Sequence, residues 1–202
     1  MNRKRHFGVV TALFALSTTL SAPVMADGLH FSMDVSTRLL ADEAGRLRGL
    51  EMRWHYDRAL TELILGEQDM STPEKRDAVM AVLGHGIMAD LFDMGYYTLL
   101  RANGEPQVFM NAPEYRASLA ADQAIQLDFM LPLRQPLAVG GVTLQLELAD
   151  PDAGLTLSYR NPARITLDPV LASRCSSPAL TTRQQVLNAH QVDIQTVTLN
   201  CR

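Results

Sequence analysis

The chain has 202 residues, 47% of them hydrophobic, and a formal net charge of −4, so it is long enough to bury the core of one domain. Its acidic balance argues against a nucleic-acid-binding protein and against binding to anionic membrane surfaces. Cationic partners are compatible with this balance, although an acidic surface also serves solubility alone.

The first 26 residues have the organisation of a secretory signal peptide. Basic residues at positions 3–5 precede an apolar run over residues 7–20, and small residues follow up to Ala26. We expect cleavage after Ala26, which leaves a single periplasmic domain over residues 27–202 that is not inserted in the membrane. The alternative is an uncleaved membrane anchor, but the apolar run is short for a membrane-spanning helix.

Two alternating runs predict an antiparallel hairpin at the start of this domain. Every second residue is apolar or threonine between positions 29 and 39, and the alternation returns between positions 50 and 56. A half-buried strand has this period of two. A turn at residues 42–45 joins the two strands. His30 and Asp34 then lie on the polar face of the first strand, and His55 lies on the polar face of the second.

Two helices are predicted next. Asp57 can cap a short helix, and residues 71–74 (STPE) form a capping box that starts a longer one. Gly84 and Gly86 weaken the longer helix around His85, where a kink would let another segment approach closely. The buried face expected for this helix consists of Val79, Val82, Leu83, Ile87, Leu91 and Met94.

The remainder of the chain is predicted to be mainly antiparallel strands. A hairpin is indicated at residues 103–104 (NG), and alternating strands at residues 125–131, 142–148 and 155–159. A short helix is predicted over residues 181–190, before a last strand that contains Val192, Ile194 and Leu199. The expected fold class is therefore α+β, with a mainly antiparallel sheet and two inserted helices.

Cys175 and Cys201 are the two cysteines of the chain. In an oxidising compartment an isolated pair usually forms a disulfide, which would close the C-terminal segment over residues 170–202. The alternative is a thiolate metal or redox site. Such a site usually has Cys-x-x-Cys or nearby histidine spacing, and neither is present.

The order of several short segments resembles the domain-of-unknown-function family 1007, a family of periplasmic proteins. The resemblance rests on residues 29–34 (LHFSMD), 49–57 (GLEMRWHYD), 95–98 (GYYT), 131–133 (LPL), 150–151 (DP) and a cysteine near Cys175. Members of this family often accompany a nickel/cobalt-type permease. The resemblance therefore implies an accessory protein in zinc, nickel or cobalt transport or homeostasis, with a membrane permease as its partner.

The chain departs from the family pattern at three places. His30 matches the second histidine of the family's His-Pro-His start, but Gly28 and Leu29 replace the first two residues. Residues 66–72 lack the Asp-rich, calcium-loop-like pattern of many relatives, and residues 152–154 replace the family's aromatic residues. These departures favour a member whose metal chemistry is weakened or lost.

His30, Asp34 and His55 are the candidate metal ligands. Imidazole suits zinc, nickel or copper, and a carboxylate either supplies a ligand or orients an imidazole ring. The alternative is that both histidines are ordinary surface residues, which favours a metal-free periplasmic protein-interaction module. An enzyme is not expected, because the sequence has no Gly-x-Ser-x-Gly elbow, no His-Glu-x-x-His motif and no phosphate-binding glycine loop.

Overall fold

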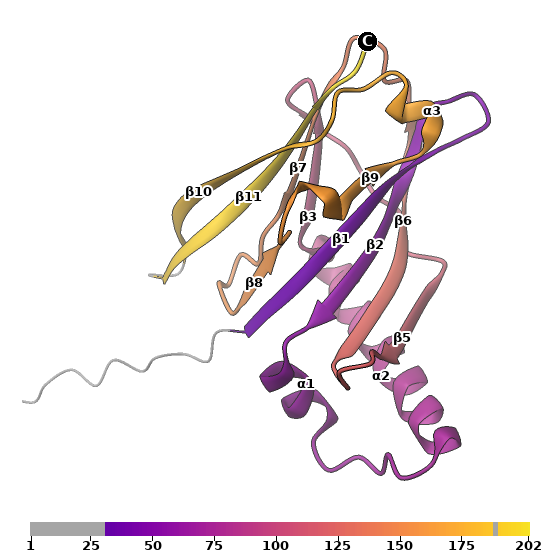
Figure 1. The fold of residues 1–202 in the computed structure, drawn as a ribbon, viewed down its shortest axis with the longest axis vertical. Coiled ribbons are helices and arrows are strands. Elements are labelled where there is room, and N and C mark those ends of the chain that lie inside the picture. Colours follow the sequence, from indigo (N-terminus) through magenta and orange to yellow (C-terminus); the bar gives the residue numbers. More distant parts are fainter. Residues whose placement is uncertain (1–30, 188–189) are drawn as a thin grey trace, which may run out of the picture.

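The computed structural model describes residues 31–187 and 190–202, which form two β-sheets with the two longer helices toward one end (Figure 1). The expected signal peptide, residues 1–26, and the candidate ligand His30 lie outside the described residues. No helix in the described part of the chain is long and apolar enough to cross a membrane.

The first sheet is built around the hairpin that the alternating pattern predicts. Its residues pair in antiparallel register from Met33 opposite Tyr56 to Leu39 opposite Leu50. Two later strands pair with the first strand in parallel, so the sheet is mainly but not wholly antiparallel. The strands of this sheet are β5 (Tyr115–Leu119), β6 (Ile125–Leu137), β2 (Leu47–Tyr56), β1 (Phe31–Ala41) and β8 (Leu155–Ser158) in spatial order, with β9 (Ile165–Leu167) also on β1.

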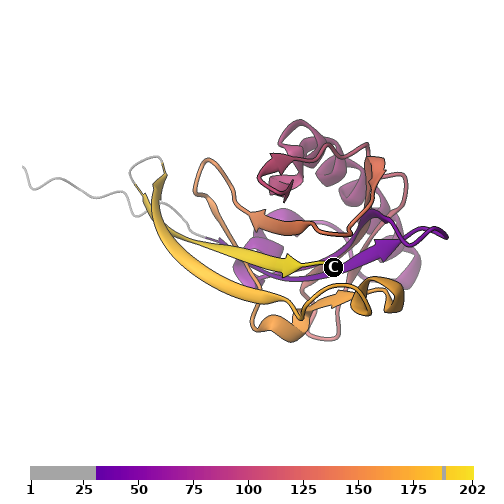
Figure 2. The same cartoon turned by 90° about the horizontal axis from the view of Figure 1, so that it is seen from above.

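The second sheet is antiparallel and ends in a long curved hairpin that extends from the body of the molecule (Figure 2). Its strands, in spatial order, are β10 (Ala179–Leu187), β11 (His190–Asn200), β7 (Thr143–Leu148), β3 (Thr98–Ala102) and β4 (Glu105–Pro106).

The prediction of a short helix over residues 181–190 is wrong, because β10 occupies most of this range. The strand pairs with β11 along its whole length, from Ala179 opposite Thr198 to Leu187 opposite His190. In this ladder the backbone groups along one side of β10 are hydrogen-bonded to β11. Pairing with a neighbouring strand outweighs the weak helical pattern of the local sequence. The expected last strand is confirmed as β11.

The helices begin where the sequence predicts, and the buried face of α2 is only partly the predicted one: Leu91 is buried and Leu83 and Ile87 pack against the core. α1 (Arg58–Leu65) is capped by Asp57 and α2 (Pro73–Asp93) by Thr72. α2 runs unbroken, so the expected kink at His85 is absent from this helix. Of its residues, Met80, Gly84, Met88 and Leu91 are buried, whereas Val82 is 73% exposed.

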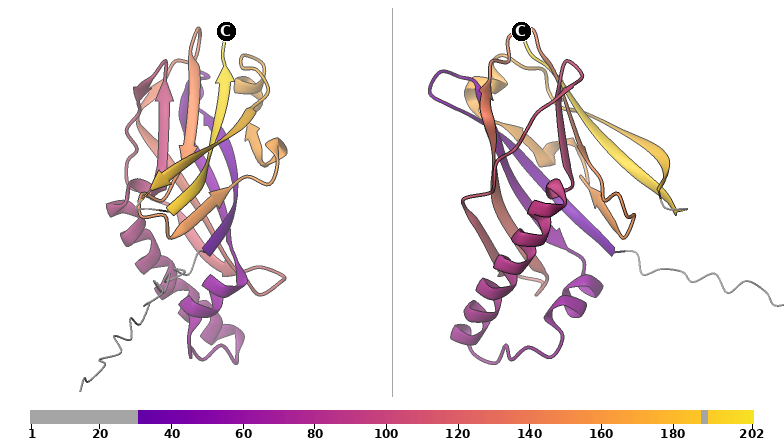
Figure 3. Two further views of the ribbon diagram at one scale, coloured as in Figure 1. Left: turned by 90° about the vertical axis from the view of Figure 1, so that its left-hand side faces the viewer. Right: turned by 180° about the vertical axis from the view of Figure 1, so that it is seen from behind.

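Close packing explains the buried face of α2. An ideal Cβ on Gly84 would lie 3.1 Å from Cβ of Ala117 on β5, which is tighter than an ordinary contact, so glycine favours this close approach. The expected close approach of another segment is therefore confirmed at Gly84. Figure 3 shows α2 beside β5 when the molecule is seen from behind.

The core lies between the two sheets, and the outer face of the first sheet is polar. Trp54 and Leu127 of the first sheet are fully buried, as is Val197 of the second. The predicted disulfide is confirmed between Cys175 and Cys201, and it joins the segment before β10 to the end of β11. Short helical turns complete the described part: η1 (Gly95–Tyr97), η2 (Pro162–Arg164) and α3 (Pro169–Ala172).

Candidate functional site

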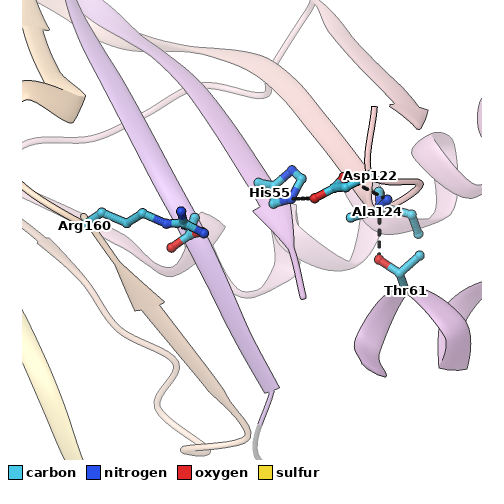
Figure 4. Close-up of polar contacts among 7 residues, drawn as sticks. His55, Thr61, Asp122, Ala124 and Arg160 are labelled. Atoms are coloured by element: carbon cyan, nitrogen blue, oxygen red, sulfur yellow. Dashed lines mark hydrogen bonds and ion pairs between the residues drawn. The ribbon is translucent and has the colours of Figure 1, made fainter. Parts of the chain in front are cut away.

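A hollow of about 400 Å³ lies on the polar face of the first sheet, where β1 begins and β2 ends. The side chains around it come from both strands, the start of α1, the turn between β5 and β6, and the segment after β8. Figure 4 shows three of them, His55, Asp122 and Arg160. They are Ser32, Asp34, His55, Tyr56, Asp57, Arg58, Asp122, Ala124 and Arg160.

Asp34 and His55 are brought together as the alternating pattern predicts. The two residues are directly opposite each other in the β1–β2 ladder, so their side chains project from the same face. The carboxylate of Asp34 nevertheless pairs with Arg160, whose Nε donates to Oδ2 of Asp34 at 2.6 Å. This hydrogen bond and the charge of Asp34 raise the pKa of Arg160, which therefore stays cationic. Asp34 thus already has a cation as its partner.

His55 is paired with a residue that the sequence analysis did not single out. Its Nε2 lies 3.0 Å from Oδ2 of Asp122, which belongs to the turn between β5 and β6. With the proton on Nε2, the ring donates to the carboxylate. No hydrogen bond of its Nδ1 is found among the residues that the structure describes.

The turn that carries Asp122 is held by hydrogen bonds on both sides. Oδ1 of Asp122 accepts from the backbone N–H of Ala124 at 3.2 Å, and this bond is the main cause that lowers the pKa of Asp122, with His55 adding to it. The next residue, Ile125, donates its N–H to Oγ1 of the buried Thr61 on α1 at 3.0 Å (Figure 4). The carboxylate is therefore ionised at neutral pH and fixed in place beside His55.

Asp57 has a structural role at the rim of the hollow. Its Oδ1 accepts from the N–H of Leu60, as expected of an N-cap, and its Oδ2 accepts from the N–H of Ser32. Both carboxylate oxygens are thus used to fasten α1 to β1. Asp57 is consequently not a free ligand.

The sequence matches the protein family described as "Protein of unknown function (DUF1007)" over residues 12–196. The chain belongs to the DUF1007 family. No curated protein matches the chain. Every residue around the hollow falls within the DUF1007 match, so the hollow belongs to the family's own domain and not to an appendage.

In this DUF1007 chain the described residues alone do not complete a metal site. Across residues 31–187 and 190–202, no group of three or more His, Cys, Asp or Glu side chains is arranged to hold a metal ion. The hollow contributes one free imidazole nitrogen and the carboxylate that orients the ring. His30, the residue before Phe31, lies outside the described part, so the set of three ligands stays a prediction.

Sequence reasoning missed Asp122 and Arg160 because their partners are distant in the chain. Asp122 is 67 residues from His55, and Arg160 is 126 residues from Asp34. No local spacing connects such pairs. The alternation over residues 125–131 predicts the strand next to Asp122, but the register between β6 and β2 decides that Asp122 reaches His55.

Proposed function

We propose that this chain is a periplasmic accessory protein that binds a divalent transition metal, namely zinc, nickel or cobalt, and acts with a membrane permease. The pairing of His55 with Asp122 at 3.0 Å carries the proposal. Metal-binding histidines commonly use one ring nitrogen for the metal and donate the other N–H to a carboxylate. The ionised, fixed carboxylate of Asp122 suits that second role, and Nδ1 of His55 suits the first.

His30 supplies the second imidazole in this proposal. It stands two residues before Ser32, and Ser32 lines the same hollow as His55. Two imidazoles and one carboxylate form a common ligand set for borderline metals. Asp34 is the carboxylate in the best position to complete this set, and a metal ion must displace Arg160 to bind it.

The location and the partner are part of the proposal. The organisation of residues 1–26 supports export, and the bond between Cys175 and Cys201 supports an oxidising compartment. The resemblance to family members that accompany nickel/cobalt-type permeases supports the permease as the partner. The role is one of binding and transfer, without a catalytic step.

A metal-free interaction module is the second candidate, and two observations favour it. Arg160 already neutralises Asp34, which weakens the hollow as a cation site. α2 also exposes apolar side chains, with Val82 73% and Phe92 49% exposed. Exposed apolar residues that gather on one element are typical of a contact surface.

A competition titration separates the two candidates. The chain from Asp27 onward is stripped with a chelator and titrated with zinc against a chromophoric chelator, beside the variants His55→Ala and His85→Ala. His85 lies on α2 outside the hollow, so it is the matched control. We expect one zinc per chain, an affinity at least about tenfold lower in His55→Ala and unchanged affinity in His85→Ala. Equal affinity in the parent and His55→Ala would contradict the site, and no zinc binding by the parent would favour the second candidate.

A further inference from the structure

The outermost strand of the first sheet lies along a groove beside α2. β5 is the last strand in the sheet order, with β6 on one side and no strand on the other among the described residues. A hollow of about 900 Å³ follows this strand. Its lining comes from residues 113–119 on one side and from Arg76, Asp77, Met80, Ala81 and Gly84 of α2 on the other.

Among the described residues, β5 has backbone groups without a hydrogen bond that point away from β6. The N–H of Met130 donates to the carbonyl of Glu114, and the N–H of Ala120 donates to the carbonyl of Ala124. In an antiparallel ladder, alternate residues of a strand bond to the same neighbour. Given the register of β5 on β6, the N–H and C=O groups of Tyr115, Ala117 and Leu119 therefore point toward the free edge.

α2 forms one wall of the groove without replacing a strand. The atom of β5 nearest to an ideal Cβ on Gly84 is Cβ of Ala117, which pairs across the ladder with the buried Leu127. α2 thus packs against the inner face of β5. A second hollow of about 510 Å³ on the outer face shares Glu114, Tyr115 and Arg116 with the first. The start of the β5 edge is therefore open from both faces.

We propose that this groove binds an extended peptide segment of another protein, which adds to β5 as a further strand. Free backbone donors and acceptors in a row are satisfied by an extended partner, and main-chain hydrogen bonds supply much of the affinity in such complexes. The edge of β10 is also free, but its exposed residues line none of the larger hollows found in the described part of the chain.

The residues on the two faces of β5 indicate which side chains the partner has. Successive residues of an added strand point to opposite faces. One set meets Met80 and Ala81 of α2, so we expect small or medium apolar side chains there. The other set lies on the outer face near Arg116 and Glu114, and suits polar or charged side chains. The partner is therefore a segment of alternating apolar and polar residues.

This inference goes beyond the proposed metal function and does not depend on it. The groove and the hollow around His55 share no lining residue. The experiment is accordingly done with chelator present, so that failure of metal binding has no influence on its result.

A library of random peptides displayed on phage is selected against the chain from Asp27 onward, and the most enriched peptide is measured by fluorescence anisotropy. Ala81→Arg fills the groove with a long charged side chain. Ala78→Arg is the matched control, because Ala78 is an exposed alanine of the same helix that does not line the groove. We expect Ala81→Arg to weaken binding at least about tenfold and Ala78→Arg to leave it within about twofold.

Backbone methylation tests the mode of binding. The enriched peptide is synthesised with methyl groups on alternate backbone nitrogens, which removes donors and keeps every side chain. Methylation of one alternate set should weaken binding at least about tenfold. The proposal is overturned if no peptide is enriched, or if neither methylated set binds more weakly. It is also overturned if the chain is a dimer that Ala81→Arg dissociates, since the occupant is then a second copy.

Discussion

Asp34 and His55 are directly opposite each other on neighbouring strands, yet their side chains have different partners. Asp34 pairs with Arg160 from the segment after β8, and His55 pairs with Asp122 from the turn before β6. The register of the hairpin thus places Asp34 and His55 close together. The segment after β8 and the turn before β6 then determine which of the two side chains is available to a cation. In the metal proposal, Arg160 is the competitor that a metal ion must displace to reach Asp34.

Removing that competitor should strengthen metal binding. Arg160→Gln deletes the cation and leaves Asp34 free to act as a ligand, so we expect zinc affinity to rise by about twofold to fivefold, the range of an exposed ion pair. The measurement is the same zinc competition titration. Arg164→Gln is the control, because Arg164 lies on the same sheet face outside the hollow. Unchanged or weaker affinity in Arg160→Gln would exclude Asp34 as a ligand.

The lowered pKa of Asp122 predicts a pH-dependent contribution to stability. Its pKa in the folded chain is below the ordinary value, so the ionised carboxylate favours folding at pH values above the unfolded-state pKa, near 4. That contribution is lost as the pH falls through the folded-state pKa. In urea unfolding at a series of pH values, Asp122→Asn should be less stable than the parent at neutral pH and should converge with it in acid. Parallel pH profiles for the two proteins would contradict this coupling.

The hairpin that carries Asp34 and His55 was predictable because apolar and polar residues alternate along each of its strands. Its alternation fixes which side chains share a face without any knowledge of the rest of the fold. The partners of those side chains were not predictable, because Asp122 and Arg160 reach the hollow only through the order of strands in the sheet. The same reason explains α2, where Gly84 is buried by contact with Ala117, a neighbour that lies far from it in the sequence.

Two glycines of α2 provide a test of this packing. Gly84 lies against Ala117, whereas an added Cβ on Gly86 would meet nothing within 4 Å. Gly84→Leu should therefore lower the free energy of unfolding by about 2 kcal/mol through overpacking against β5. Gly86→Leu should raise it by up to about 1 kcal/mol through helix propensity. Urea denaturation of both variants checks the difference, and similar effects at the two positions would contradict the close contact.

The disulfide should stabilise the chain by constraining its C-terminal segment. Cys175 and Cys201 are 26 residues apart, and a loop of this length corresponds to about 3 kcal/mol in the chain-entropy description. The double variant Cys175→Ser with Cys201→Ser should lose stability of this order in urea unfolding. The parent in reducing agent is the control and should behave in the same way. A double variant as stable as the oxidised parent would show that the bond adds nothing to the folded sheet.

Metal binding at the hollow is tested most directly by the imidazole nitrogen resonances of the isotope-labelled chain from Asp27 onward, recorded before and after one equivalent of zinc. We predict that the ring signals of His30 and His55 shift to those of metal-bound imidazole, with Nδ1 of His55 as the bound nitrogen. His85 makes its hydrogen bond with Tyr115, away from the hollow, and its signals should stay unchanged. Unchanged signals from His55, or a shift at His85 alone, would contradict a metal site built on His55 and Asp122.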